Sequence, residues 1–241
     1  MVSYAMLTNK GERENNEDYI DMKEDTEAYC FVLADGLGGH GRGEVASELV
    51  VETTKDLFHN TNNLENYLNK AFATSQDKLI KYQNAEKAGN EMKTTEVILA
   101  IGSEKIQWGH IGDSRLYHFK GNRIAKRTLD HSVPQMLVSS GEIKEKDIRR
   151  HPDRNRVLRV MGTDWTTPKY EIASPVKNKK NQSFLLCTDG FWELIEESDM
   201  KSLLKKAATP QEWLESMEKI VLENGKGTNM DNYSAIAVWI R

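Results

Sequence analysis

Two apolar stretches of this sequence end in the same dipeptide, Asp-Gly. Residues 30–34 (CFVLA) lead into Asp35, residues 184–188 (FLLCT) lead into Asp189, and a glycine follows each carboxylate. Short apolar runs bounded by turn residues are typical of buried strands, although a single Asp-Gly pair also marks an ordinary turn. Because the pattern occurs twice, we predict that two buried strands carry their carboxylates to one rim of a shared core.

The C-terminal stretch 235–240 restricts the fold further. Its apolar residues occupy odd and even positions alike, so a strand here is apolar on both faces. A sheet covered by a second sheet on one face and by helices on the other satisfies this pattern. Further strands are expected at 2–7, 19–22, 28–34, 97–101, 106–111 and 115–119. Helices are expected at 44–58, along the apolar stripe 64–79 and near 213–221, and a polar loop is expected at 84–91.

Composition and short motifs argue against several classes of protein. The net charge of −4 argues against nucleic-acid binding by bulk charge. No apolar run approaches the ~20 residues that span a bilayer, and the N-terminus does not resemble a secretory signal, so we expect a cytoplasmic protein. Cys30 and Cys187 are expected to be reduced core residues, with a disulfide as the less favoured alternative. Neither begins a Cys-x5-Arg phosphatase loop, and no usual zinc spacing occurs.

Acidic residues beside predicted strand ends indicate a site for hard divalent cations. They are Glu17, Asp18, Asp35, Asp113, Asp189 and Asp231. Carboxylates, a backbone carbonyl and water suit magnesium or manganese better than zinc. Two such ions about 4 Å apart can lower the pKa of a shared water until it is a hydroxide nucleophile near neutral pH. A nearby guanidinium can hold phosphate oxygens in a planar fork.

Eight motifs, in this order, resemble those of the metal-dependent protein phosphatases, the PPM or protein phosphatase 2C family, in its bacterial single-domain form. They are RENNED at 13–18, LADGLGGHGRGEVAS at 33–47, TT at 94–95, GHIGDSRLY at 109–117, LDHS at 129–132, HPDRNRVLRVMG at 151–162, LLCTDGFWELI at 185–195 and DNYSAIAV at 231–238. Each motif is weak alone, but together they span nearly the whole chain. The resemblance implies one α+β domain over 1–241, with a central sandwich of two antiparallel sheets flanked by helices.

The resemblance also implies an activity and site residues. A member hydrolyses phosphoserine and phosphothreonine in proteins by direct attack of a metal-bridging hydroxide, reversing a serine/threonine kinase. By position, the resemblance implies that Asp35 bridges two Mn²⁺ or Mg²⁺ ions, that Gly36 offers its carbonyl to one of them, and that Asp189 and Asp231 complete the protein ligands of the other. It implies that Glu17 and Asp18 act through metal-bound water or as outer ligands, and that Asp113 supports a third, weaker ion. Arg13 is implied to hold the phosphate group. Leu37 stands where animal members have histidine, which leaves His40 or a metal-bound water as the leaving-group acid.

The stretch 139–160 matches the flap that borders the metal cleft in this family. Residues 144–159 contain seven lysines and arginines and three acids, with little apolar periodicity. A solvated surface excursion would explain this composition. We predict instead a flap whose exposed basic side chains, Arg149 and Arg150 among them, meet acidic or phosphorylated partners.

Two alternative functions use the same fold. A non-catalytic phospho-binding module would have lost metal carboxylates, and none is missing here. Phosphatases that act on anti-anti-sigma factors usually carry extra sensor or membrane segments, which this sequence lacks. The preferred prediction is a monomeric serine/threonine protein phosphatase that acts on phosphorylated proteins.

Overall fold

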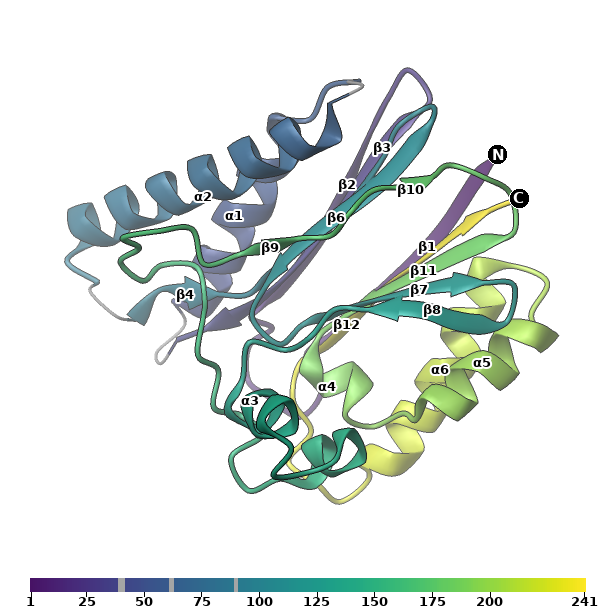
Figure 1. The fold of residues 1–241 in the computed structure, drawn as a ribbon. Helices are drawn as coiled ribbons and strands as arrows, with labels where there is room; N and C mark the ends of the chain where they lie inside the picture. The colour runs from purple at the N-terminus through teal and green to yellow at the C-terminus, as the bar shows by residue number, and fades with distance from the viewer. Residues whose placement is uncertain (39–41, 61–62, 89–90) are drawn as a thin grey trace.

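Two antiparallel β-sheets lie face to face at the centre of a computed structural model that describes residues 1–38, 42–60, 63–88 and 91–241 (Figure 1). One sheet has the strand order β1-β12-β11-β7-β8 and the other β10-β6-β5-β3-β2, with β4 paired to β3 and β9 to β6. The strands are β1 (Val2–Asn9), β2 (Asp18–Asp25), β3 (Ala28–Leu37), β4 (Lys93–Thr94), β5 (Glu96–Ile101), β6 (Lys105–Ile111), β7 (Arg115–Lys120), β8 (Arg123–Arg127), β9 (Glu171–Ile172), β10 (Val176–Lys177), β11 (Gln182–Cys187) and β12 (Tyr233–Ile240).

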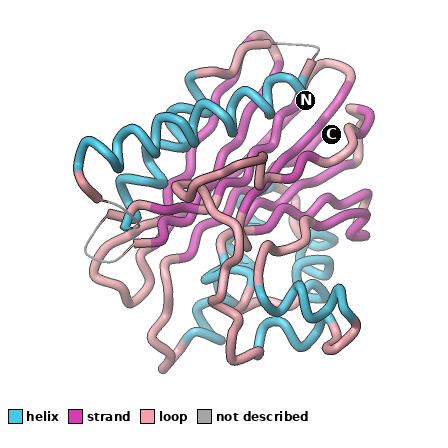
Figure 2. Tube along the Cα trace, turned by 60° about the vertical axis from the view of Figure 1, so that its left-hand side comes forward, coloured by secondary structure: helices cyan, strands magenta, loops and turns pink. Residues whose placement is uncertain are grey.

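Helices cover the outer face of each sheet, as Figure 2 also shows. Helices α1 (Gly43–Asp56) and α2 (Leu64–Glu86) cover the sheet that contains β3, and α5 (Glu197–Lys206) and α6 (Pro210–Gly225) cover the sheet that contains β12. The short helices α3 (Val133–Ser140), α4 (Asp189–Trp192) and the 3₁₀ helix η2 (Glu145–Arg150) lie near one end of the sandwich. The predicted four-layer arrangement of helices, sheet, sheet and helices is confirmed. Within the described ranges, no helix is long and apolar enough to cross a membrane.

Three hydrophobic clusters separate the four layers. On β3, Phe31 and Leu33 pack between the two sheets, whereas Cys30 and Val32 face α1 and α2. Strand β12 behaves in the same way, with Val238 between the sheets and its neighbours against α6. Burial of one such side chain contributes roughly 1.5–3 kcal/mol, which explains why both faces of these strands are apolar.

Some sequence predictions need correction at the level of single elements. Helix α2 continues to Glu86, so the first three residues of the predicted loop 84–91 are helical. The helix ends where Lys87 adopts a left-handed conformation and its N–H bonds to the Asn84 carbonyl. Cys30 and Cys187 are free and buried in different layers, so the expectation of reduced core cysteines is confirmed.

A carboxyl group, that of Glu96, is buried beneath α1. Its Oε1 accepts a hydrogen bond from Thr54 Oγ1 at 2.5 Å, and its buried Oε2 has no hydrogen-bond partner in the described structure. Burial raises the pKa of Glu96 to about 8. The folded protein therefore keeps a proton on this group at neutral pH, whereas the unfolded chain does not.

Glu96→Gln should remove part of the pH dependence of stability. Between the ordinary pKa of a glutamate and about 8, the unfolded state binds fewer protons at this group. The free energy of unfolding therefore falls as pH rises, by at most about 1.4 kcal/mol per pH unit. Urea unfolding of both proteins across this window measures the difference, and parallel pH profiles would show that Glu96 is already ionised in the folded state.

Candidate active site

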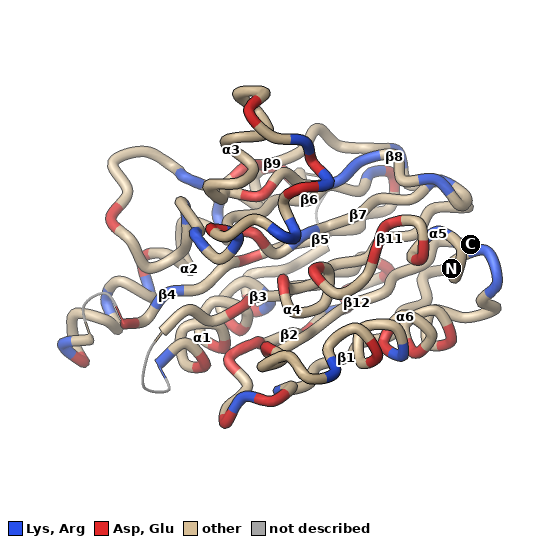
Figure 3. The backbone as a smooth tube through the Cα atoms, turned by 90° about the horizontal axis from the view of Figure 1, so that it is seen from below, with Lys and Arg blue, Asp and Glu red and all other residues tan. Residues whose placement is uncertain are grey.

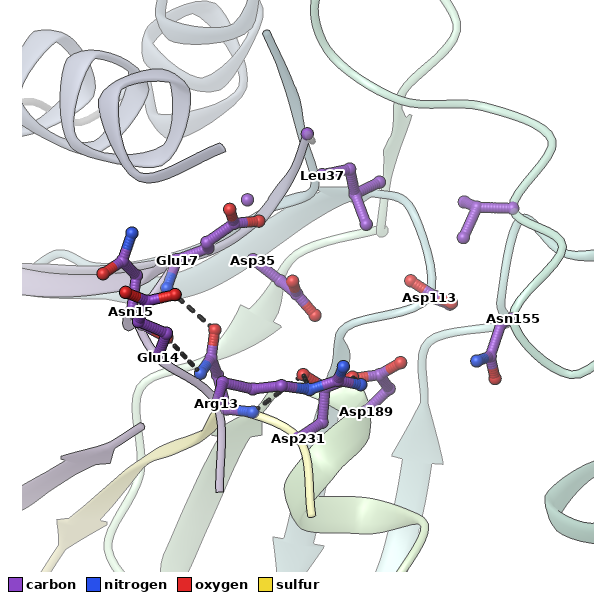
Figure 4. Close-up of a pocket in the computed structure, with 14 residues that line it drawn as sticks. Arg13, Glu14, Asn15, Glu17, Asp35, Leu37, Asp113, Asn155, Asp189 and Asp231 are labelled. Carbon is purple, nitrogen blue, oxygen red and sulfur yellow. Dashed lines mark hydrogen bonds and ion pairs between the residues drawn. The ribbon is translucent and has the colours of Figure 1, made fainter. Parts of the chain in front are cut away.

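The acidic residues expected at strand ends meet in a pocket of about 590 Å³ at one rim of the sandwich (Figure 4). Its lining residues are Arg13, Glu14, Asn15, Glu17, Asp35, Gly36, Leu37, Gly38, Asp113, Asn155, Val157, Asp189, Asp231 and Asn232. Of the predicted site residues, only Asp18 does not line the pocket, and it lies opposite Asp35 in the β2–β3 pairing. His40 lies outside the described residues.

The position of Asp35 is set by two threonines of the neighbouring chain segment. The Asp35 N–H donates to Thr95 Oγ1 at 2.9 Å, and Thr94 Oγ1 donates to the Asp35 carbonyl at 2.8 Å. Thr95 Oγ1 also lies 2.8 Å from Ser114 Oγ, in the turn that carries Asp113. One hydrogen-bond network therefore holds the backbone of Asp35 in place and links it to the turn of Asp113.

Gly36 allows three segments to approach closely beside Asp35. A Cβ at this residue would lie 2.3 Å from the Gly43 carbonyl oxygen and 2.6 Å from that of Glu17. The Gly36 N–H donates to the Glu17 carbonyl at 3.0 Å. Only glycine fits here, because any side chain would push β2 or the start of α1 away from the rim.

Asp18 and Asp35 form a like-charged pair across two strands. Like charges directly opposite each other destabilise a sheet, so this pairing is unfavourable when both carboxylates are ionised. Asp18 Oδ2 accepts a hydrogen bond from Thr188 Oγ1 at 3.0 Å, whereas its buried Oδ1 has no partner among the described residues. A divalent cation would relieve the repulsion and use oxygen atoms that the protein leaves unpaired.

Burial and mutual repulsion favour protons on the carboxylates of this rim. Burial raises the pKa of Asp18 to about 8, although hydrogen bonds from neighbouring hydroxyl groups lower it in part. The charges of Asp189 and Asp231 add to the increase. Burial and the charge of Asp231 raise the pKa of Asp189 to about 6. Burial and the charge of Asp189 raise the pKa of Asp35 and of Asp113 well above the ordinary value. A bound cation would displace these protons, and the oxygen-only ligand set suits Mg²⁺ or Mn²⁺.

Arg13 lies at the mouth of the pocket, paired with Asp231 (Figure 4). Its Nε and Nη2 donate to Asp231 Oδ1 and Oδ2, each at 3.0 Å, and its side chain is 42% exposed. Asn232 holds this loop in place by donating to the carbonyls of Lys10 and Asn15. Sequence reasoning missed Asn232, although it directly follows Asp231 in the last motif.

A buried ion pair behind the pocket was also missed. Arg115 donates from Nε and Nη2 to the two carboxylate oxygens of Asp130, at 2.8 and 2.6 Å. Its guanidinium carbon lies 3.3 Å from the centroid of the Trp192 ring. Trp192 Nε1 in turn donates to the Asp113 carbonyl at 3.0 Å. Arg115 and Asp130 therefore support Asp113 without lining the pocket.

His131 holds the same turn from another side. The backbone N–H of His131 donates to the Gly112 carbonyl at 2.9 Å, and the backbone N–H of Gly112 donates to the ring nitrogen Nδ1 of His131 at 3.1 Å. Burial lowers the pKa of His131 to about 4, so the ring is neutral and carries its proton on Nε2, 3.2 Å from Glu171. His110, His131 and Glu171 lie close enough to suggest a metal site, but this tautomer leaves His131 no free lone pair for a metal.

The segment 139–160 borders the pocket through Asn155 and Val157. The prediction that Arg149 is an exposed charge is wrong, because its side chain is only 11% exposed. Its guanidinium donates to the carbonyls of Trp192 and Ile195 and forms an ion pair with Glu197 at 2.9 Å. Arg149 fastens the segment to the molecule, whereas Arg150 is exposed as predicted.

A β-sandwich that gathers carboxylates and one arginine at a rim defines a metal-dependent enzyme suited to phosphate esters. The family model of Protein phosphatase 2C matches residues 9–225, and the chain belongs to this family of metal-dependent serine/threonine protein phosphatases. The serine/threonine phosphatase stp of Listeria welshimeri is 31% identical over 200 residues, which cover 80% of this chain and 79% of that protein.

Solved structures agree with this assignment. Serine/threonine phosphatase Stp1 from Staphylococcus aureus superposes with a TM-score of 0.87 at 28% identity, covering 100% of this chain and 96% of that one. The catalytic domain of the phosphatase PstP, solved with two manganese ions, has the same fold, with a TM-score of 0.83 at 24% identity over 99% and 98% of the two chains. The predicted family, fold and enzyme class are confirmed.

Proposed function

We propose that Asp35, Asp189 and Asp231 are the protein ligands of two Mn²⁺ or Mg²⁺ ions with which this phosphatase hydrolyses phosphoserine and phosphothreonine in proteins. The observation that carries this proposal is the convergence of buried, mutually repelling carboxylates in one pocket. The two manganese ions of the PstP catalytic domain support it from a protein of the same fold. When bound, the ions supply an activated water by lowering its pKa.

The remaining rim residues have secondary roles in the proposed site. Gly36 offers its carbonyl to an ion, Glu17 and Asp18 act as outer ligands or through bound water, and Asp113 supports a third, weaker ion. The hydrogen bonds of Thr94, Thr95 and Trp192 orient Asp35 and Asp113. Among the described residues that line the pocket, none is serine, threonine, cysteine or histidine. With the aspartates of the pocket assigned to the metal ions, this favours direct attack of water on phosphorus over a covalent phosphoenzyme.

Arg13 is the proposed phosphate clamp. In the structure its guanidinium is paired with Asp231, so it must exchange that partner for the substrate. Cations bound to Asp231 would weaken the Arg13 pair and free both donors for phosphate oxygens. The half-exposed position of Arg13 at the pocket mouth gives it access to both partners.

Hydrolysis of p-nitrophenyl phosphate and of a phosphothreonine peptide tests the proposal. Turnover should require Mn²⁺ or Mg²⁺, stop in EDTA and return when excess metal is added. The ratio of the two metal-supported rates gives the metal preference. Full turnover in EDTA, after dialysis against the chelator, would refute the assignment of the rim carboxylates.

Arg13→Ala should weaken phosphate binding far more than it slows the bound substrate. A charge-assisted contact of this kind contributes roughly 1.5–3 kcal/mol, which corresponds to an increase of about 10- to 150-fold in KM and in the inhibition constant of phosphate. Lys10→Ala, in an exposed residue of the same loop, serves as the control. An inhibition constant for inorganic phosphate equal to that of the unmodified protein would exclude Arg13 as the clamp.

The organisation and setting of the enzyme are further parts of the proposal. We propose one phosphatase domain over residues 1–241, with a flap at about 139–160, that acts as a monomer on the substrates of a serine/threonine kinase. Asn155 and Val157 in the pocket lining support the flap, and the free, buried cysteines support a cytoplasmic location. Light scattering would test the monomer, because a dimer would double the measured mass.

A further inference from the structure

A second hollow lies at the end of the sandwich opposite the acidic rim, and its lining is basic. It has a volume of about 610 Å³ and is lined by Lys120, Gly121, Val176, Lys177, Lys179, Lys180, Asn181 and Gln182. We call it the lysine groove. It lies between the β7–β8 turn and the segment that leads from β10 to β11, beside the C-terminus, where Figure 3 shows lysines and arginines together.

Strand pairing places like charges opposite each other beside this groove. Lys177 of β10 is the cross-strand partner of Lys105 of β6, and Lys120 of β7 is the partner of Arg123 of β8. Like charges directly opposite each other destabilise a sheet. Packing and local propensity therefore do not account for these basic residues, and a departure of this kind from local consistency is characteristic of functional sites.

The protein does not neutralise this charge itself. Lys105, Lys120, Arg123, Lys177, Lys179 and Lys180 are exposed. In the described parts of the chain, none of them forms an ion pair with a carboxylate, although the whole protein has a net charge of −4. No acidic residue lines the groove. Its potential is thus opposite in sign to that of the catalytic rim.

The lysine groove is separate from the catalytic pocket. Gln182 opens β11 at the groove, and Asp189 lies just beyond the other end of the same strand. At about 3.4 Å per residue, this separation is on the order of 20 Å. A phosphate group in the catalytic pocket therefore cannot reach these lysines, but an extended protein chain that continues across the surface can.

We propose that the lysine groove docks an extended, acidic segment of a protein partner, in which carboxylates or phosphate groups supply the negative charge. The groove has the size of an ordinary ligand site, and the exposed Asn181 adds an amide group to its charges. It presents no aromatic side chain on which nucleic-acid bases could stack. Its one apolar lining residue, Val176, is half-buried and offers no anchor for a bilayer.

Docking can be measured without turnover. The probes are a fluorescent glutamate-rich peptide and the same peptide with non-hydrolysable phosphonate groups in place of some carboxylates. The groove variant is Lys177→Gln/Lys179→Gln/Lys180→Gln. Lys70→Gln/Lys78→Gln/Lys81→Gln on α2 removes the same charge from exposed lysines elsewhere. We expect the groove variant to bind roughly tenfold more weakly, as three surface charge contacts predict, and the α2 variant to bind like the unmodified protein.

Each outcome of this experiment has a defined meaning. A loss with both peptides identifies charge of either source as the ligand, and a loss confined to the phosphonate peptide identifies phosphate. Equal losses in the groove and α2 variants would show a bulk charge effect and overturn the proposal. Tighter binding of single-stranded RNA or of phosphatidylserine vesicles than of the peptides, through the same lysines, would also overturn it.

Two further readouts separate docking from a structural role. The groove variant should hydrolyse p-nitrophenyl phosphate at the unmodified rate, because this small substrate does not reach the groove. It should also melt at a slightly higher temperature, because Lys177 no longer repels Lys105. A groove variant that is destabilised and loses turnover would show that these lysines maintain the fold, and the proposal would fail.

Discussion

Asp35→Asn is expected to abolish metal-dependent hydrolysis and to leave a folded, more heat-stable protein when metal is withheld. Burial first, and then the charges of Asp189, Asp18, Asp113 and Asp231 in this order, raise the pKa of Asp35. Loss of one carboxylate removes a proposed bridging ligand, so turnover should fall by at least roughly 100-fold, the range found when one electrostatic contact of a catalytic site is removed. The same change removes repulsion from the metal-free rim.

Two measurements and one control distinguish these effects. Turnover of a phosphothreonine peptide at saturating Mn²⁺ reports the ligand role, and thermal unfolding in EDTA reports the relief of repulsion. Asp77→Asn, in an exposed residue of α2, makes the same chemical change away from the rim. Retention of more than about a tenth of the unmodified turnover, well above the expected loss, would remove Asp35 from the proposed metal site.

The strand ends were predictable because their signal is local. An apolar run followed by Asp-Gly identifies both a buried strand and a carboxylate at its end, so Asp35 and Asp189 could be assigned from a few residues each. Their convergence depends on strand order, which no local pattern gives, and it was expected from the repetition of the Asp-Gly pattern and from the resemblance. The structure places both residues in one pocket.

The supporting contacts were not predictable, because they join residues far apart in the sequence. Arg149 belongs to a basic run, and its composition suggested an exposed patch. Its guanidinium is instead taken up by carbonyl groups of Trp192 and Ile195, more than forty residues along the chain. Asn232 similarly reaches Lys10, which is 222 positions away. No spacing rule describes such contacts.

Asp130→Asn should destabilise the protein more than any other single change considered above. Asp130 is the nearer of two acidic partners of Arg115, whose side chain is 2% exposed, and Glu197 Oε1 lies farther away, 3.7 Å from Arg115 Nη1. Tyr117 also accepts a hydrogen bond from Arg115 Nη1 at 3.0 Å, but its hydroxyl is neutral. Removal of one partner from a buried ion pair lowers the free energy of unfolding by about 3–5 kcal/mol. Urea unfolding at neutral pH measures this loss directly.

The coupling between the two charges gives the decisive control. Arg115→Met/Asp130→Leu replaces both members of the pair with apolar groups, so neither is left as an unpaired buried charge, and Arg127, whose Nη1 lies 3.9 Å from Asp130, keeps its ion pair with Glu145. Because a buried pair loses much of its attraction to desolvation, this double variant should be more stable than either Arg115→Met or Asp130→Leu alone. Arg115 also packs on Trp192, which donates a hydrogen bond to the Asp113 carbonyl, so the double variant should bind the proposed third ion less tightly although its stability recovers. The double variant would lose as much stability as the two single variants together only if the two charges act independently. That result would show that the ion pair is not what holds the turn of Asp113 against the core.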